Sequence, residues 1–93
     1  MKWTKINQAT LYLSLSYLTI TLMITSKDIY KITILDKILD KPSTANIKAS
    51  SLDLAKKIAI KTAMTHVRTI MTQYEIAESE LKEKEVTKNG NNT

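Results

Sequence analysis

The chain has 93 residues with one Gly, one Pro and no Cys, which excludes disulfides and thiolate metal sites and supplies few turn residues for a many-stranded β fold. Fourteen Lys and Arg against nine Asp and Glu give a net charge of +5, which suits nucleic acid, an acidic protein or an anionic lipid surface, although a Lys-rich composition explains it equally well. A chain of this length forms one small domain, or a membrane anchor with a short soluble part.

The first predicted element is an uncharged run over residues 6–26, bracketed by Lys5 and Lys27. About 20 largely apolar residues are enough to cross the hydrocarbon core of a bilayer as a helix, and Ser and Thr cost far less in lipid than charges do. The run therefore predicts a single membrane-spanning helix, with residues 1–26 as a membrane anchor. A cytoplasmic C-terminal part is favoured because more Lys residues follow the run than precede it: Lys27, Lys31, Lys37 and Lys41 against Lys2 and Lys5.

The same stretch supports two other interpretations. Apolar residues alternate with polar ones over 18–25 and again over 29–35, which is typical of a β-hairpin at about 11–35. Against the hairpin, the apolar residues occupy odd positions up to Tyr17 and even positions from Leu18 onward, and such a slip turns side chains to the opposite face. A third interpretation is a buried helix in a cytoplasmic, soluble protein, because Leu11, Leu15, Leu18 and Leu22 fit a helical stripe.

A short amphipathic segment is predicted over residues 27–42. Leu, Asp and Lys recur with a period of four across 35–41, which stacks like residues above one another on a helix. Pro42 is expected to end this helix, because the residue before a proline disfavours the α conformation. Residues 43–50, rich in Ser, Thr and Asn, are predicted to be a connector.

One long amphipathic helix is predicted over residues 51–88, followed by a frayed tail at 89–93. No Gly or Pro interrupts residues 51–89, and Ser50 or Ser51 is placed to cap the first amides, with Asp53 in the first turn. The apolar residues of this helix recur in alternate steps of three and four, which makes a seam for packing against another helix. The seam consists of Ile60, Ala63, Val67, Ile70, Tyr74, Ala77 and Leu81.

Together these elements predict a mostly α protein with an N-terminal hydrophobic helix, a short amphipathic helix and one long amphipathic helix. The alternative is an α+β fold in which the hairpin at about 11–35 packs on the long helix. Charge along the long helix is divided, with a net +4 over residues 48–68 and −3 over residues 75–85. Two copies laid antiparallel would attract each other, so an antiparallel homodimer is one predicted mode of association.

The sequence offers no catalytic constellation. His66 is the only His and lies beside Val67, so it is interpreted as a boundary residue rather than a base or a ligand. The five C-terminal Glu residues are spread around the helix and interleaved with Lys, which does not make a cation cage. The single Gly, at position 90, rules out glycine-rich phosphate loops. We therefore expect no enzymatic activity, cofactor, structural metal or small-molecule substrate.

The predicted function is a class: a small, non-enzymatic, membrane-anchored interaction or assembly protein, such as an accessory or structural subunit, that contacts a partner helix through the seam. The alternative is a soluble basic helical protein that binds nucleic acid through Lys57, Lys61 and Arg68, which lie opposite the seam. The same cationic face would suit any anionic surface, with Lys56 as a further contact.

Overall fold

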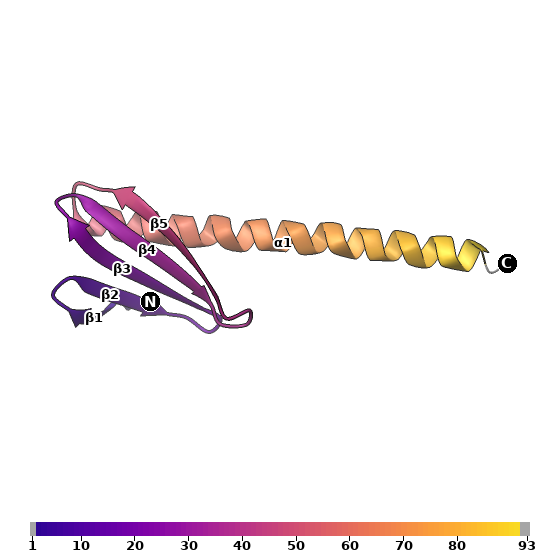
Figure 1. The fold of residues 1–93 in the computed structure, drawn as a ribbon, viewed down its shortest axis with the longest axis horizontal. Coiled ribbons are helices and arrows are strands. Elements are labelled where there is room, and N and C mark those ends of the chain that lie inside the picture. The colour runs from indigo at the N-terminus through magenta and orange to yellow at the C-terminus, as the bar shows by residue number, and fades with distance from the viewer. Residues whose placement is uncertain (1, 92–93) are drawn as a thin grey trace. The chain divides into compact units, whose positions relative to one another are not determined.

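The computed structural model describes residues 2–91, with the side chains of residues 2–85, and this part of the chain forms five β-strands followed by one α-helix (Figure 1). The elements are β1 (Thr4–Asn7), β2 (Thr10–Ser14), β3 (Leu18–Ser26), β4 (Ile29–Asp36), β5 (Lys41–Lys48) and α1 (Leu52–Asn91). The chain divides into two compact units, Met1–Ala63 and Met64–Thr93. The first unit holds the strands and the start of α1, and the described part of the second unit is the remainder of α1.

The five strands form one antiparallel sheet in chain order, β1-β2-β3-β4-β5. Figure 1 shows them side by side in this order, from indigo β1 to magenta β5. Each strand pairs with its neighbour in the sequence, so every connection is a short hairpin loop and no crossover is needed. The sheet is therefore built entirely from local pairings, which cost little loop-closure entropy.

One face of the sheet is apolar and provides the core of the first unit. Leu22 of β3 lies opposite Leu11 of β2 and Ile32 of β4, and all three side chains are buried. The next row of the core holds Leu13, Ile20 and Ile34. Alternate residues point to the other face, where one row across the sheet contains Tyr12, Thr21, Thr33 and Thr44. The alternation of apolar and polar residues is thus that of a sheet with one covered and one hydrated face.

The structure contradicts the predicted membrane helix. Residues 6–26 belong to β1, β2, β3 and the loops between them, and within the described residues no helix is both long and apolar enough to cross a bilayer. Ser14 of β2 and Thr19 and Thr21 of β3, which dilute the run, occupy outward-facing positions of two strands, not scattered polar positions on a helix. The mostly α fold class, the single-pass anchor and its topology are therefore wrong. The α+β alternative was nearer, because the stretch at about 11–35 contains β2, β3 and most of β4.

The change from odd to even apolar positions is explained by a loop. Residues 15–17 form the loop between β2 and β3, so the odd positions of β2 and the even positions of β3 can face the same side of the sheet. Leu13 and Ile20 are accordingly both buried in the core. The backbone N–H of Leu15 donates to the carbonyl of Leu18 at 2.8 Å and closes this turn. The slip that argued against a β structure therefore marks the end of one strand and the start of the next.

The predicted helix at 35–41 is also wrong, because these residues are the end of β4, a loop and the first residue of β5. The carboxylate of Asp36 accepts hydrogen bonds from the backbone N–H of Ile38 at 2.9 Å and of Leu39 at 3.0 Å. Asp40 completes the turn with a φ of 50°, a left-handed conformation that Asp tolerates better than most residues. The period of four in this segment reflects turn chemistry repeated at Asp36 and Asp40, not helical stacking.

The predicted connector at 43–50 consists mainly of β5, which pairs with β4 along its whole length. Pro42 lies inside this strand, opposite Leu35. A proline is tolerated there because β5 is at the edge of the sheet, where one side of the strand needs no hydrogen-bond donor. Ala49 and Ser50 then lead directly into the helix.

The long helix predicted at 51–88 is present as α1, and Ser51 is its cap. The Ser51 hydroxyl accepts a hydrogen bond from the backbone N–H of Leu54 at 3.1 Å, and Asp53 adds a negative charge in the first turn. The helix continues to Asn91, past Gly90, so the start of the predicted frayed tail is helical. Residues 92–93 lie outside the described part of the chain.

Within the first unit, α1 covers the apolar face of the sheet through a row of small residues. Ala55 and Ala59 have no exposed surface, Ala63 is 5% exposed, and all three belong to the same core cluster as Leu13 and Leu22. Their spacing of four places them on one stripe of the helix. Because Ala has the shortest apolar side chain, this stripe lets the helix backbone approach the Leu and Ile side chains of the sheet closely.

Candidate helix-pairing surface

The seven seam residues do not share one environment. Ala63 is buried in the core of the first unit, and Ile60 is half-buried. The other five run from residue 67 to residue 81 and become more exposed along the chain: Val67 and Ile70 are half-buried, Ala77 is exposed, and Tyr74 and Leu81 are 59% and 70% exposed. We call these five residues the distal seam.

Sequence reasoning missed the part of α1 that contacts the sheet. Ala55 and Ala59 lie outside the predicted seam, although they are as deeply buried as any residue in the first unit. The available signal was the spacing of Ala55, Ala59 and Ala63, which continues the stripe of the seam toward the start of the helix. Ala contributes little to a hydrophobic pattern because its side chain is small. The pattern therefore located the helix but did not show which of its residues are buried in the core of the first unit.

The distal seam lies on a stretch of helix that is otherwise highly exposed. Every side chain from residue 71 to residue 85 is exposed. Met64 and Met71 flank the seam, and they are 47% and 55% exposed. Flexible Met side chains beside an apolar stripe widen the surface available to a partner and adapt to its shape. The arrangement is that of an amphipathic helix whose apolar face is available for packing.

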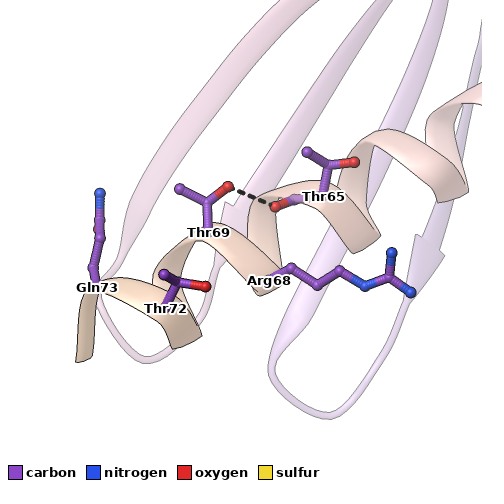
Figure 2. Close-up of a pocket in the computed structure, with 5 residues that line it drawn as sticks. All are labelled: Thr65, Arg68, Thr69, Thr72 and Gln73. Atoms are coloured by element: carbon purple, nitrogen blue, oxygen red, sulfur yellow. Dashed lines mark hydrogen bonds between the residues drawn. The ribbon is translucent and has the colours of Figure 1, made fainter. Parts of the chain in front are cut away.

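The face of α1 opposite the seam carries polar side chains. Lys57, Lys61 and Arg68 are exposed, whereas Lys56 is half-buried. A shallow hollow of about 280 Å³ lies beside Arg68. Figure 2 shows the side chains that line it, which come from successive turns of the same helix: Thr65, Arg68, Thr69, Thr72 and Gln73. The Thr69 hydroxyl donates to the carbonyl of Thr65 at 2.9 Å, so it is engaged by its own helix (Figure 2). A hollow lined by one helix alone has no opposing wall, and it is a surface rather than an enclosed pocket.

A second exposed apolar patch lies on two loops of the first unit, and the sequence analysis did not identify it. The backbone N–H of Lys37 donates to the carbonyl of Tyr17 at 2.9 Å, and the Lys37 ammonium donates to the Ser14 hydroxyl at 3.0 Å and to the Leu15 carbonyl. These bonds hold the β2–β3 loop against the β4–β5 loop, at one end of the sheet (Figure 1). The apolar side chains on the two loops are Leu15, Tyr17, Ile38 and Leu39, and Ile38 is 72% exposed.

Two further polar features of α1 are His66 and an ion pair near its acidic end. His66 is half-buried, and its Nε2 has no hydrogen-bond partner among the described residues. Lys82 and Glu78 form an ion pair at 3.3 Å along the exposed helix, a type of pair worth only about 0.3–0.5 kcal/mol. Within the described residues, no three His, Asp or Glu side chains lie close enough together to hold a metal ion. The distal seam is therefore the most extended feature on this helix that offers a defined contact.

No protein-family model, no curated protein and no solved structure matches this chain. Its function is therefore inferred from the surfaces of the chain itself.

Proposed function

We propose that this chain is a non-enzymatic assembly protein that associates through the distal seam of α1, most simply with a second copy of itself. The observation that carries the proposal is the exposure of large apolar side chains at regular helical spacing, with Tyr74 at 59% and Leu81 at 70%. Within the first unit, the stripe of Ala residues packs the start of α1 against the sheet.

The energetics favour a covered seam. Most of the stability of helices in proteins comes from packing of an amphipathic face, because isolated helices in water are marginal. Burying one exposed large aliphatic or aromatic side chain contributes about 1.5–3 kcal/mol. In the distal seam this applies to Tyr74 and Leu81, whereas Val67 and Ile70 are already half-buried and gain less. In a pair of helices each copy buries this set. Part of that gain offsets the entropy lost on association, so the net free energy of association is smaller than the summed burial energies.

The proposal is tested by placing a charge in the distal seam. Ile70→Asp is expected to raise the dissociation constant at least about 100-fold, because a buried, unpaired carboxylate costs about 3–5 kcal/mol. Static light scattering over a range of concentrations should give a mass above 10.5 kDa for the wild type and the monomer mass for the variant.

The matched control is Thr72→Asp, which introduces the same charge two residues away on the exposed polar face. This variant should associate like the wild type. Circular dichroism should show that both variants keep the helix. A wild type that stays at the monomer mass at every concentration would contradict self-association. Equal losses of association in Ile70→Asp and Thr72→Asp would show that the distal seam is not the contact surface.

A second candidate function is nucleic-acid binding, which the distribution of charge favours. Residues 1–63 contain ten Lys against four Asp, a net +6, whereas the rest of the chain has a net −1. Lys57, Lys61 and Arg68 are exposed on the polar face of α1, where they can contact phosphates without disturbing the distal seam. The face lacks aromatic residues for stacking on bases, so binding would be electrostatic and independent of sequence.

Duplex DNA titrations at several salt concentrations test this second candidate. Loss of the three contacts in a triple Lys57→Ser, Lys61→Ser, Arg68→Ser variant should reduce the slope of log K against log salt by roughly 3, at about 0.9 per phosphate contact. A double Lys82→Ser, Lys84→Ser variant on the acidic end of the helix is the control and should leave the slope nearly unchanged. No binding at low salt, or equal slopes in the triple variant and the wild type, would exclude this cationic face as a nucleic-acid site.

A further inference from the structure

The start of α1 covers one face of the sheet and leaves the other face open. We call this second side of the sheet the open face. Its central row crosses all five strands and consists of Thr4, Tyr12, Thr21, Thr33 and Thr44, which pair with one another in register. Each of these side chains carries a hydroxyl group, which can both donate and accept a hydrogen bond. The open face is therefore a polar surface with one aromatic ring near its middle.

The aromatic ring belongs to Tyr12, which is half-buried. Its partners in the neighbouring strands, Thr4 and Thr21, have short side chains, so part of the ring stays accessible. Met23 lies on the same face, two residues along β3 from Thr21, and is 38% exposed. An accessible aromatic ring is a platform on which an unpaired nucleic-acid base can stack, and a flexible Met adapts to the shape of a neighbouring group.

Lysine side chains lie on both sides of the central row. Lys31 of β4 and Lys48 of β5 are exposed and take outward-facing positions toward one end of the strands. Toward the other end, the Lys37 ammonium donates to the hydroxyl of Ser14 at 3.0 Å, and Ser14 is also an outward-facing residue. An extended chain of phosphates that crosses the row at Tyr12 would therefore meet a cation on either side of it.

The acidic residues of the first unit do not occupy outward-facing positions of the open face. The unit contains four Asp and no Glu. Asp28 and Asp40 lie in turns, and Asp53 lies in α1. Asp36 takes a core-side position of β4, and its carboxylate accepts two backbone N–H groups of the following loop. Within the described residues no ion pair joins a lysine of the open face to an acid, so the charge of this face is complementary to a polyanion.

We propose that the open face of the sheet binds single-stranded nucleic acid, with a base stacked on Tyr12 and phosphates at Lys31, Lys48 and Lys37. The Thr hydroxyls of the central row supply hydrogen bonds to phosphate and sugar oxygens. A duplex fits less well, because its bases are stacked on one another and do not reach the ring. The open face is separate from the distal seam and from the cationic face of α1, so this inference depends neither on self-assembly nor on duplex binding.

Fluorescence anisotropy of a labelled oligothymidine of about ten nucleotides tests the inference with the full-length chain. Tyr12→Leu keeps a large apolar side chain on β2 but removes the aromatic ring, and it should weaken binding about 5- to 100-fold. The matched control is Tyr17→Leu on the β2–β3 loop, which is 66% exposed and should bind like the wild type. Urea unfolding followed by Trp3 fluorescence should show that both variants keep the fold.

The dependence of binding on salt tests the lysines. A double Lys31→Gln, Lys48→Gln variant should reduce the slope of log K against log salt by about 1.4, at about 0.7 per phosphate contact of a single strand. A double Lys82→Gln, Lys84→Gln variant loses the same charge at the acidic end of α1 and should leave the slope nearly unchanged.

Three results would overturn the inference. The first is no binding of oligothymidine at low salt. The second is an equal loss of affinity in the two Tyr variants together with equal slopes in the two Lys variants, which would place the anion elsewhere on the chain. The third is competition by poly-glutamate as effective as that by oligothymidine, because the face would then recognise charge alone. A monomer mass in light scattering, or loss of duplex binding in the triple α1 variant, would bear on the other two proposals and would leave these measurements unchanged.

Discussion

Leu22→Ala is expected to lower the free energy of unfolding of the first unit by about 2–5 kcal/mol. Leu22 lies on the central strand β3, has no exposed surface, and is flanked in register by Leu11 and Ile32, which are also buried. The substitution removes one methine and two methyl groups, so their favourable transfer free energy is lost. It also leaves a cavity, because the hydrogen-bonded strands cannot shift to fill the space. A unit of about 60 residues is only marginally stable, so a loss of this size approaches its whole stability.

The measurement is urea unfolding followed by the fluorescence of Trp3, the only Trp, which is half-buried against the core of the first unit. The control is Met23→Ala, one residue further along β3, where the side chain is on the other face of the sheet and 38% exposed. It should cost less than about 1 kcal/mol. In a strand, adjacent side chains point to opposite faces of the sheet. Similar losses of unfolding free energy in Leu22→Ala and Met23→Ala would therefore contradict the strand assignment of this segment.

Much of the information for the sheet was present in the sequence. The alternation over 18–25 and 29–35 correctly marks most of β3 and β4. Leu13 and Ile20 differ in phase, and a sequence pattern cannot distinguish a slip within one strand from a loop between two strands. A shortage of Gly and Pro also argued against β structure. In the structure Asp28 and Asp40 adopt left-handed conformations, with φ of 62° and 50°, and take over the role that Gly plays in many turns.

The candidate site could be predicted in part. The repeat of apolar residues located the helix and its apolar face, because helical periodicity is a local property of the sequence. What lies against that face depends on tertiary structure: the same stripe meets the sheet at Ala63 and is exposed at Tyr74 and Leu81. The loop patch held by Lys37 was beyond sequence reasoning for a related reason. Its two halves are 22 residues apart, and only the closed sheet brings Leu15 and Lys37 together.

Ala59→Leu is expected to destabilise the first unit by about 1–3 kcal/mol or more. Ala59 is fully buried between α1 and the sheet, in the middle of the stripe formed with Ala55 and Ala63. A Leu side chain adds three carbon atoms where close packing leaves no space for them, so the helix has to move away from the sheet or the new side chain has to adopt a strained rotamer. Both responses weaken the contacts of the neighbouring Ala residues, and Trp3 fluorescence should report unfolding at a lower urea concentration.

The matched control is Ala77→Leu, the same substitution on the exposed part of the same helix. It should leave the unfolding of the first unit within about 0.5 kcal/mol of the wild type. Ala77 belongs to the distal seam proposed to associate, so this variant should instead change the association measured by light scattering. The two Ala residues thus separate the roles of α1: one variant loses fold stability and the other changes association. If Ala59→Leu were as stable as the wild type, the close packing of α1 on the sheet would be wrong, whatever the state of the dimer.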